Sequence, residues 1–205
     1  MTFDRLSFFK RSALGLPLLL GVLLQGCFST PAAKPERFYF LSAPAVVPDR
    51  GGQGLRVAVD DFTTAPGYDS QRLAYRRGNE VRYYGYRQWL ASPSSLLTET
   101  TIRMMRASGR FAIVDHARRL RDAEVEIDGH VVAMEEVDSG DRWHAHLAMT
   151  LSARAERSGK TLVSHAFDET RPCARRDPSD VARVMSKILA DRIDKLGQAI
   201  LKTTP

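Results

Sequence analysis

Apolar and polar residues alternate along several stretches of this 205-residue chain, which is the pattern of strands that bury one face. We predict strands at residues 37–43, 55–62, 110–115, 123–138, 142–156 and 161–170. The turn signal Ser139-Gly140-Asp141 lies between the two longest runs and predicts that they form a hairpin. The strand at 161–170 then continues this meander.

Two other segments repeat their apolar residues at the helical period. Ser92 and Pro93 suit the start of the first helix, and Gly109 suits its end. Asp177 precedes a second, long helix whose apolar side runs from Val181 to Ile200. The order of elements predicts an α+β fold, with a mostly antiparallel sheet and two helices packed on one face.

The start of the chain has the pattern of a leader. Basic residues precede an apolar run at 13–24, which is shorter than the roughly 20 residues that span a bilayer. The sequence Leu24-Gln25-Gly26-Cys27 resembles the lipobox of bacterial lipoproteins. We therefore expect residues 1–26 to be a lipoprotein signal peptide; an ordinary signal peptide with a chance cysteine is the alternative.

The lipobox resemblance implies that Cys27 is the lipid attachment site. Several acyl chains hold a protein stably, at about 0.8 kcal/mol per buried methylene. Residues 27–36 then form a lipidated N-terminus and linker, and 37–205 form the domain. Because Phe28 follows the cysteine where an aspartate favours inner-membrane retention, we expect the periplasmic face of the outer membrane, with the inner membrane as the alternative.

Charge and cysteine content add two expectations. The chain carries a formal charge of +6, a mild excess that favours anionic lipid or an acidic partner without demanding either. With Cys27 lipidated, Cys173 has no partner for an internal disulfide. Neighbouring arginines predict a lowered pKa for its thiol.

The stretch RLAYRRGNEVRYYGYRQW, residues 72–89, interleaves arginines with aromatic residues, as nucleic-acid surfaces do. An envelope location excludes a nucleic-acid partner. Gly78-Asn79 predicts a hairpin turn, and we expect Leu73, Tyr75, Val81 and Tyr83 to share one face.

Two interpretations of this stretch stay open. In one, its aromatic residues are partly buried and its arginines form a solvated face. In the other, Arg76, Arg77, Arg82 and Tyr84 form part of a partner-binding surface, because Arg and Tyr commonly anchor interfaces.

The segments RFYFLS, VAVDDF and LAYRRGNEVRYYGYRQWLASP, the last leading into a helix, resemble the ABC-type transport auxiliary lipoprotein family over residues 37–201. The resemblance implies a non-enzymatic accessory of an ABC system with a mammalian-cell-entry-type (MCE) substrate-binding protein. Such systems move phospholipid or other hydrophobic molecules between membranes. The implied partners are the MCE-domain protein and its ABC permease, and a homo-oligomer is possible.

Other functions have weaker support. A scaffold or activator lipoprotein for envelope synthesis is one alternative, and an envelope hydrolase is another. No serine lies on a glycine-flanked elbow, and the adjacent acids Glu135 and Glu136 predict solvated residues on opposite faces of a strand. His130, His144 and His146 suggest zinc, but we expect them on the solvated face and predict no metal or cofactor.

Overall fold

The computed structural model describes residues 34–43 and 53–204. The predicted signal peptide, Cys27 and most of the predicted linker lie outside the described residues. A compact unit begins at Glu36. Among the described residues, no helix is long and apolar enough to span a membrane.

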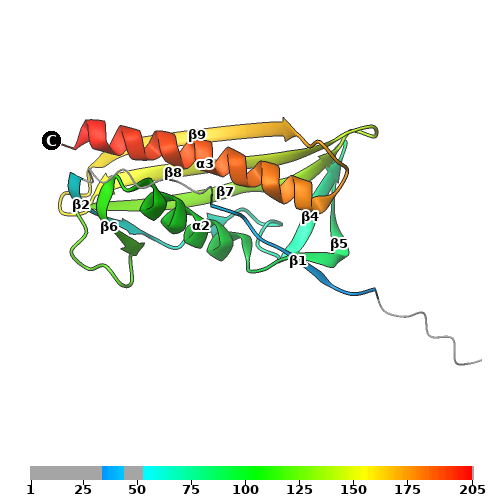
Figure 1. Ribbon diagram of the computed structural model, residues 1–205, viewed down its shortest axis with the longest axis horizontal. Helices are drawn as coiled ribbons and strands as arrows, with labels where there is room; N and C mark the ends of the chain where they lie inside the picture. Colours follow the sequence, from blue (N-terminus) through cyan, green and yellow to red (C-terminus); the bar gives the residue numbers. More distant parts are fainter. Residues whose placement is uncertain (1–33, 44–52, 205) are drawn as a thin grey trace, which may run out of the picture. The chain divides into compact units, whose positions relative to one another are not determined.

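The described residues form one nine-stranded sheet and two helices (Figure 1). The elements are β1 (Arg37–Tyr39), β2 (Gln53–Val59), β3 (Thr63–Thr64), β4 (Arg72–Arg77), β5 (Glu80–Trp89), α2 (Pro93–Ser108), β6 (Phe111–His116), β7 (Val125–Asp138), β8 (Trp143–Ala155), β9 (Thr161–Pro172) and α3 (Pro178–Thr203). The α+β prediction is confirmed.

Strand β7 organises the sheet. One of its edges pairs along its whole length with β8, which in turn pairs with β9, both in antiparallel fashion. Along the other edge, β2, β3 and β4 follow one another, each parallel to β7. β6 extends the sheet beyond β2, and β5 and then β1 extend it beyond β4.

The sheet is therefore mixed, and the expectation of a mostly antiparallel sheet needs correction. The chain from β2 to β4 passes once along β7 in the same direction, as one strand interrupted by loops. β1 also pairs with β5 in parallel, and β2 with β6. Alternation in the sequence reveals a strand and its faces, but it does not specify the direction of its neighbour.

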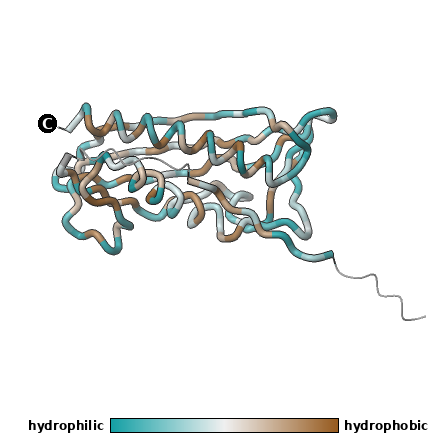
Figure 2. The backbone as a smooth tube through the Cα atoms, viewed as in Figure 1, coloured by the Kyte–Doolittle hydropathy of each residue, from teal (hydrophilic) through white to brown (hydrophobic). Residues whose placement is uncertain are grey.

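Helices α2 and α3 contact each other, and both pack on the same face of the sheet (Figure 1). As predicted, Ser92 accepts a hydrogen bond from the backbone N–H of Ser95, and Gly109 ends α2 with a φ of 65°. Asp177 caps α3 by accepting from the N–H of Ser179. Hydrophobic and hydrophilic residues alternate along α3 in turns (Figure 2), and its apolar side is buried.

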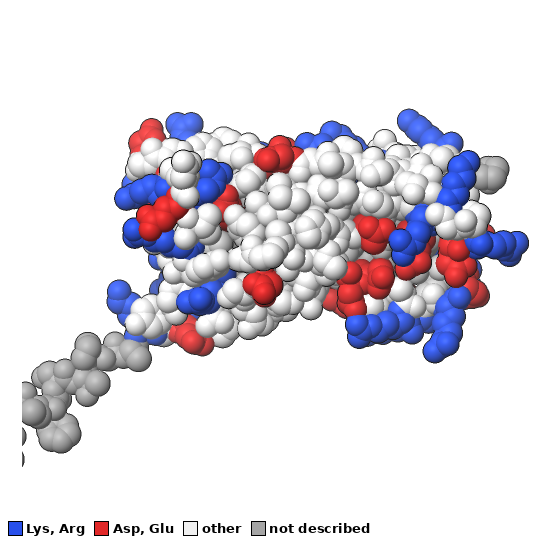
Figure 3. Space-filling model, turned by 180° about the vertical axis from the view of Figure 1, so that it is seen from behind, with Lys and Arg blue, Asp and Glu red and all other residues white. Residues whose placement is uncertain are grey.

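The core lies between the helices and the sheet. Alternate residues of β8, from Ala145 to Ala153, point into it, and Trp89 at the end of β5 is buried with them. On the face of the sheet turned away from the helices, charged residues gather at the two ends and few lie between (Figure 3).

Strands β4 and β5 form the predicted hairpin, with Arg77 opposite Glu80. The predicted shared face is wrong, because Tyr75 lies opposite Arg82 and Val81 lies opposite Arg76. A two-residue turn places odd-numbered residues of one strand opposite even-numbered residues of the other, and directly opposed residues share a face.

Candidate functional site: a buried acidic pair and the hairpin above it

Two consecutive carboxylates lie at the point where β4 meets β7. Glu135 and Glu136 are both buried, and as neighbours on a strand they point to opposite faces of the sheet. Burying a charge is costly unless it is paired, so the partners of each carboxylate determine what this region can do.

Glu135 is held by three donors from different elements. Arg76 Nε donates to its Oε1 at 2.6 Å, and His146 Nδ1 donates to the same oxygen at 2.9 Å. The Tyr68 hydroxyl donates to Oε2 at 2.7 Å. Burial acts to raise the pKa of Glu135, but the hydrogen bonds from His146, Arg76 and Tyr68 bring that pKa below its ordinary value.

His146 links this carboxylate to a second one. Its Nε2 lies 2.8 Å from Oδ1 of Asp168 on β9, so each ring nitrogen faces a carboxylate oxygen. Because both partners are acceptors, this geometry favours the form of the ring that carries a proton on both nitrogens, the imidazolium. The hydrogen bond to Glu135 accordingly raises the pKa of His146, against the opposing effect of burial.

Glu136 has a different environment. Its carboxylate accepts from the Tyr84 hydroxyl at 2.9 and 3.0 Å, and the Arg87 guanidinium stacks 4.6 Å from the centre of the Tyr84 ring. Burial raises the pKa of Glu136 to about 7, which the Tyr84 hydrogen bond only partly offsets. This carboxyl is therefore partly protonated near neutral pH.

The prediction that these acids and His146 are solvated is wrong. Arg76 and Tyr68 cover Glu135 on its face of the sheet, so Glu135 is buried although the alternation of β7 assigns it to solvent. The sequence missed Tyr68 and Asp168 as members of this cluster. The pairing of Glu135 with His146 could have been predicted from the sequence, because the hairpin that joins β7 and β8 places these two residues opposite each other.

The four residues predicted for partner binding divide into two pairs. Arg76 and Tyr84 bond the buried carboxylates, so they hold β4 and β5 against β7. Arg77 and Arg82 carry side chains that are 69% and 60% exposed. Arg77 reaches Asp138 at 2.7 Å, and Arg82 pairs with Glu80 at the turn.

Cys173 is buried beside the start of α3, and the prediction of a lowered pKa is wrong. Burial and the carboxylates of Asp180 and Glu136 raise the pKa of its thiol to about 11. The predicted activating arginines have other partners: Arg171 pairs with Glu169 and Asp191, and Arg176 lies over the Trp143 ring.

The other two histidines of the predicted cluster, His130 and His144, do not converge with His146. His130 bonds the Thr63 hydroxyl, and His144 lies 3.4 Å from the Ser139 hydroxyl. Within residues 34–43 and 53–204, no group of three or more His, Cys, Asp or Glu side chains is arranged to hold a metal ion.

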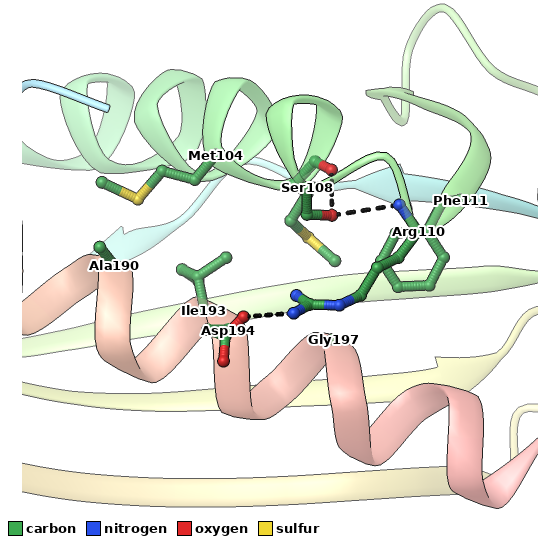
Figure 4. A pocket seen from close by; sticks show the side chains of 9 residues that line it. Met104, Ser108, Arg110, Phe111, Ala190, Ile193, Asp194 and Gly197 are labelled. Atoms are coloured by element: carbon green, nitrogen blue, oxygen red, sulfur yellow. Dashed lines mark hydrogen bonds and ion pairs between the residues drawn. The ribbon is translucent and has the colours of Figure 1, made fainter. Parts of the chain in front are cut away.

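A small pocket lies between α2 and α3 (Figure 4). Met104 and Ile193 line it from the two helices, and an ion pair of 2.6 Å joins Arg110 to Asp194 across it. Its volume of about 50 Å³ accommodates a few water molecules, whereas ligand sites measure ~300–1,000 Å³. An acyl chain does not fit there.

Two solved structures have a fold similar to that of this chain. Protein XCC0632 from Xanthomonas campestris superposes with a TM-score of 0.68 at 18% identity, covering 80% of this chain and 95% of that chain. Hypothetical protein CT253 from Chlamydia trachomatis gives 0.54 at 10% identity, covering 72% and 98%. These similarities show a shared fold.

No curated protein sequence matches the chain. The family of ABC-type transport auxiliary lipoprotein components matches residues 39–196, from the end of β1 to the last turns of α3. This match covers most of the segments that carry the resemblance noted in the sequence, including the β4–β5 hairpin and Ser92. The chain belongs to the ABC-type transport auxiliary lipoprotein family.

Proposed function

We propose that this protein is an outer-membrane-anchored periplasmic accessory of an MCE-type ABC system that moves phospholipid or other hydrophobic molecules between membranes. It acts by docking the transport partner and catalyses no reaction. Family membership supports the accessory role, and the observation that carries the docking role is the β4–β5 hairpin, which buried contacts hold to β7 and whose turn is exposed.

Buried contacts on both faces of the sheet hold the hairpin to β7. Arg76 bonds Glu135 on one face, and Tyr84 bonds Glu136 on the other. A buried charge-assisted contact holds its partners in one geometry, since moving either would leave a carboxylate unpaired. The reactive side chains of this region thus serve to fix the hairpin.

The hairpin tip, residues 77–82, has the composition of an interface anchor. It contains the exposed side chains of Arg77, Arg82 and Val81, together with Glu80, which pairs with Arg82. Arginine with nearby apolar surface is typical of interface centres, and a pre-fixed loop loses little conformational entropy when it binds. The tip therefore suits an acidic surface on the MCE-domain partner.

The test is capture of the MCE-domain protein of the same transport system by the lipidated protein. We expect Arg77→Glu with Arg82→Glu to weaken capture tenfold or more, because both contacts become repulsive. Arg157→Glu with Lys160→Glu, an equal charge change in the exposed β8–β9 turn, should leave it unchanged.

Two results would contradict the proposal. Equal capture by both double variants would remove the hairpin tip as the docking surface. Capture of a peptidoglycan synthase in place of the MCE-domain protein would favour the scaffold or activator role.

A further inference from the structure

Four large apolar side chains are exposed together where β1 meets β5 at one edge of the sheet. The exposed fractions are 54% for Phe38, 58% for Phe40, 48% for Tyr86 and 63% for Leu90. We call these residues the apolar edge patch. Single exposed apolar residues are ordinary, but a cluster at a sheet edge marks a contact surface.

The backbone pairing brings these residues together. Phe38 lies opposite Gln88 in the parallel β1–β5 ladder, and Tyr86 lies two residues before Gln88. The N–H of Leu90 donates to the carbonyl of Tyr39 at 2.7 Å, which brings Leu90 beside Phe40. The alternate positions, Tyr39 and Trp89, pack into the core, so the fold itself turns Phe38 and Phe40 outward.

We propose that the apolar edge patch lies on the lipid surface of the membrane to which the protein is anchored. This contact would fix the orientation of the domain on the membrane. The inference rests on the lipid anchor of the family and does not depend on which transport partner docks at the hairpin tip.

The position of the patch in the chain is the first argument for a lipid surface. Phe38 follows Cys27, the residue that the leader pattern marks for lipid, by eleven positions. An extended chain of this length spans at most about 40 Å, so the patch stays close to the bilayer. The anchor keeps the domain beside the membrane, so the patch meets lipid at a high effective concentration. Even a weakly binding surface then stays in contact with the lipid.

Charge is the second argument. Arg72 lies opposite Gln88 and therefore on the patch side of the ladder, where its guanidinium is 5.0 Å from the centre of the Tyr83 ring. Among the described residues it forms no ion pair. Glu36, an acid on this side, accepts a hydrogen bond from Gln88. Exposed aromatic and aliphatic groups beside a free cation suit a bilayer interface with anionic headgroups.

The test places a polarity-sensitive fluorophore on the lipidated protein in vesicles of phosphatidylethanolamine and phosphatidylglycerol. The label is attached at Leu90→Cys, and matched controls carry it at Ile113→Cys on β6 or Val132→Cys on β7, which are also exposed. Quenching by bromine-labelled acyl chains then reports which position contacts lipid.

We expect the label at position 90 to shift to the blue and to be quenched severalfold more than either control. Phe38→Ser with Phe40→Ser should abolish the difference, because it removes the two aromatic contacts. Arg72→Glu should reduce it in these vesicles and not in vesicles of phosphatidylcholine.

Three outcomes would overturn the proposal. The label at position 90 could be quenched no more than the controls, or the protein could fail to be retained by vesicles. In the third outcome, the label at position 90 is as shielded from water without vesicles as with them, and Phe38→Ser with Phe40→Ser both removes this shielding and dissociates an oligomer of the protein. That result would assign the patch to a second copy of this chain.

Discussion

Glu135 and Glu136 are consecutive buried residues of β7, and their pKa values shift in opposite directions. Both lose hydration, which disfavours the carboxylate form. Glu135 is compensated by two cationic donors and a hydroxyl, whereas Glu136 has one neutral hydroxyl in contact and Arg87 stacked beyond it. The difference in partners decides the sign of each shift, and it leads to different pH behaviour.

The raised pKa of Glu136 predicts that stability falls as the pH rises. Between its usual value of 4.5 and its folded value of about 7, the folded state binds more protons than the unfolded state, so the free energy of unfolding decreases with pH. The shift corresponds to roughly 3 kcal/mol. His146, whose pKa is also raised, contributes stability at low pH that is lost in the same direction.

Glu136→Gln should flatten part of this dependence and raise stability above neutral pH, because the amide oxygen still accepts from Tyr84 and carries no charge. The measurement is urea unfolding between about pH 5 and pH 8. Glu156→Gln, a change at an exposed acid, serves as the control and should leave the profile as in the wild type. An unchanged profile for Glu136→Gln would show that this carboxyl is ionised in the folded protein.

Replacing Arg76 should destabilise the fold rather than only weaken docking. Arg76→Ala leaves the buried Glu135 carboxylate with His146 and Tyr68, so we expect a loss of about 2–4 kcal/mol in urea unfolding at neutral pH. Adding Glu135→Gln should recover part of this loss. Arg82→Ala, at an exposed pair, should leave the unfolding midpoint unchanged, and equal effects of the two alanine variants would contradict the buried network.

The sequence predicted where strands and helices lie in the chain better than it predicted which strands pair in the sheet. Period-two alternation located the long β7–β8–β9 meander, and cap residues such as Ser92 and Asp177 located the helix starts, because these signals are local. The parallel passage of β2, β3 and β4 along β7 depends on contacts between residues far apart in sequence. Alternation carries no information about them.

In the candidate site, too, local features were predictable from the sequence and contacts between distant residues were not. The hairpin tip was predictable from Gly78-Asn79, and its exposed Arg77 and Arg82 follow from the turn. Burial of Glu135 requires Tyr68 and Arg76 to cover it, which the alternation of β7 does not encode. The pKa of Cys173 depended likewise on burial and on Asp180, rather than on the arginines nearest in sequence.

Cys173 should therefore react slowly with thiol reagents. With a pKa of about 11, about one thiol in a thousand is ionised at pH 8, and the side chain is also buried. In a Cys27→Ser protein this is the one remaining thiol, and Ellman's reagent should label it at least a hundredfold more slowly than in guanidinium chloride. Comparable rates in the two conditions would show an accessible, ionised thiol.

Gly129, the glycine of β7, should be difficult to replace, because the Phe62 ring lies directly over it. A methyl group at this position would approach three ring atoms at 2.9 Å, and Phe62 is itself held by a hydrogen bond from its N–H to the Thr98 hydroxyl on α2. We expect Gly129→Ala to cost about 1–3 kcal/mol of unfolding free energy, measured by urea denaturation. Gly85→Ala on β5, where nothing lies within 4 Å of the added carbon, should be neutral, and Phe62→Leu should partly rescue Gly129→Ala by making room for the methyl group. A neutral Gly129→Ala would show that β2, β3 and the loop carrying Phe62 can move away from β7, and the parallel half of the sheet would then be less tightly packed than the Phe62–Gly129 contact implies.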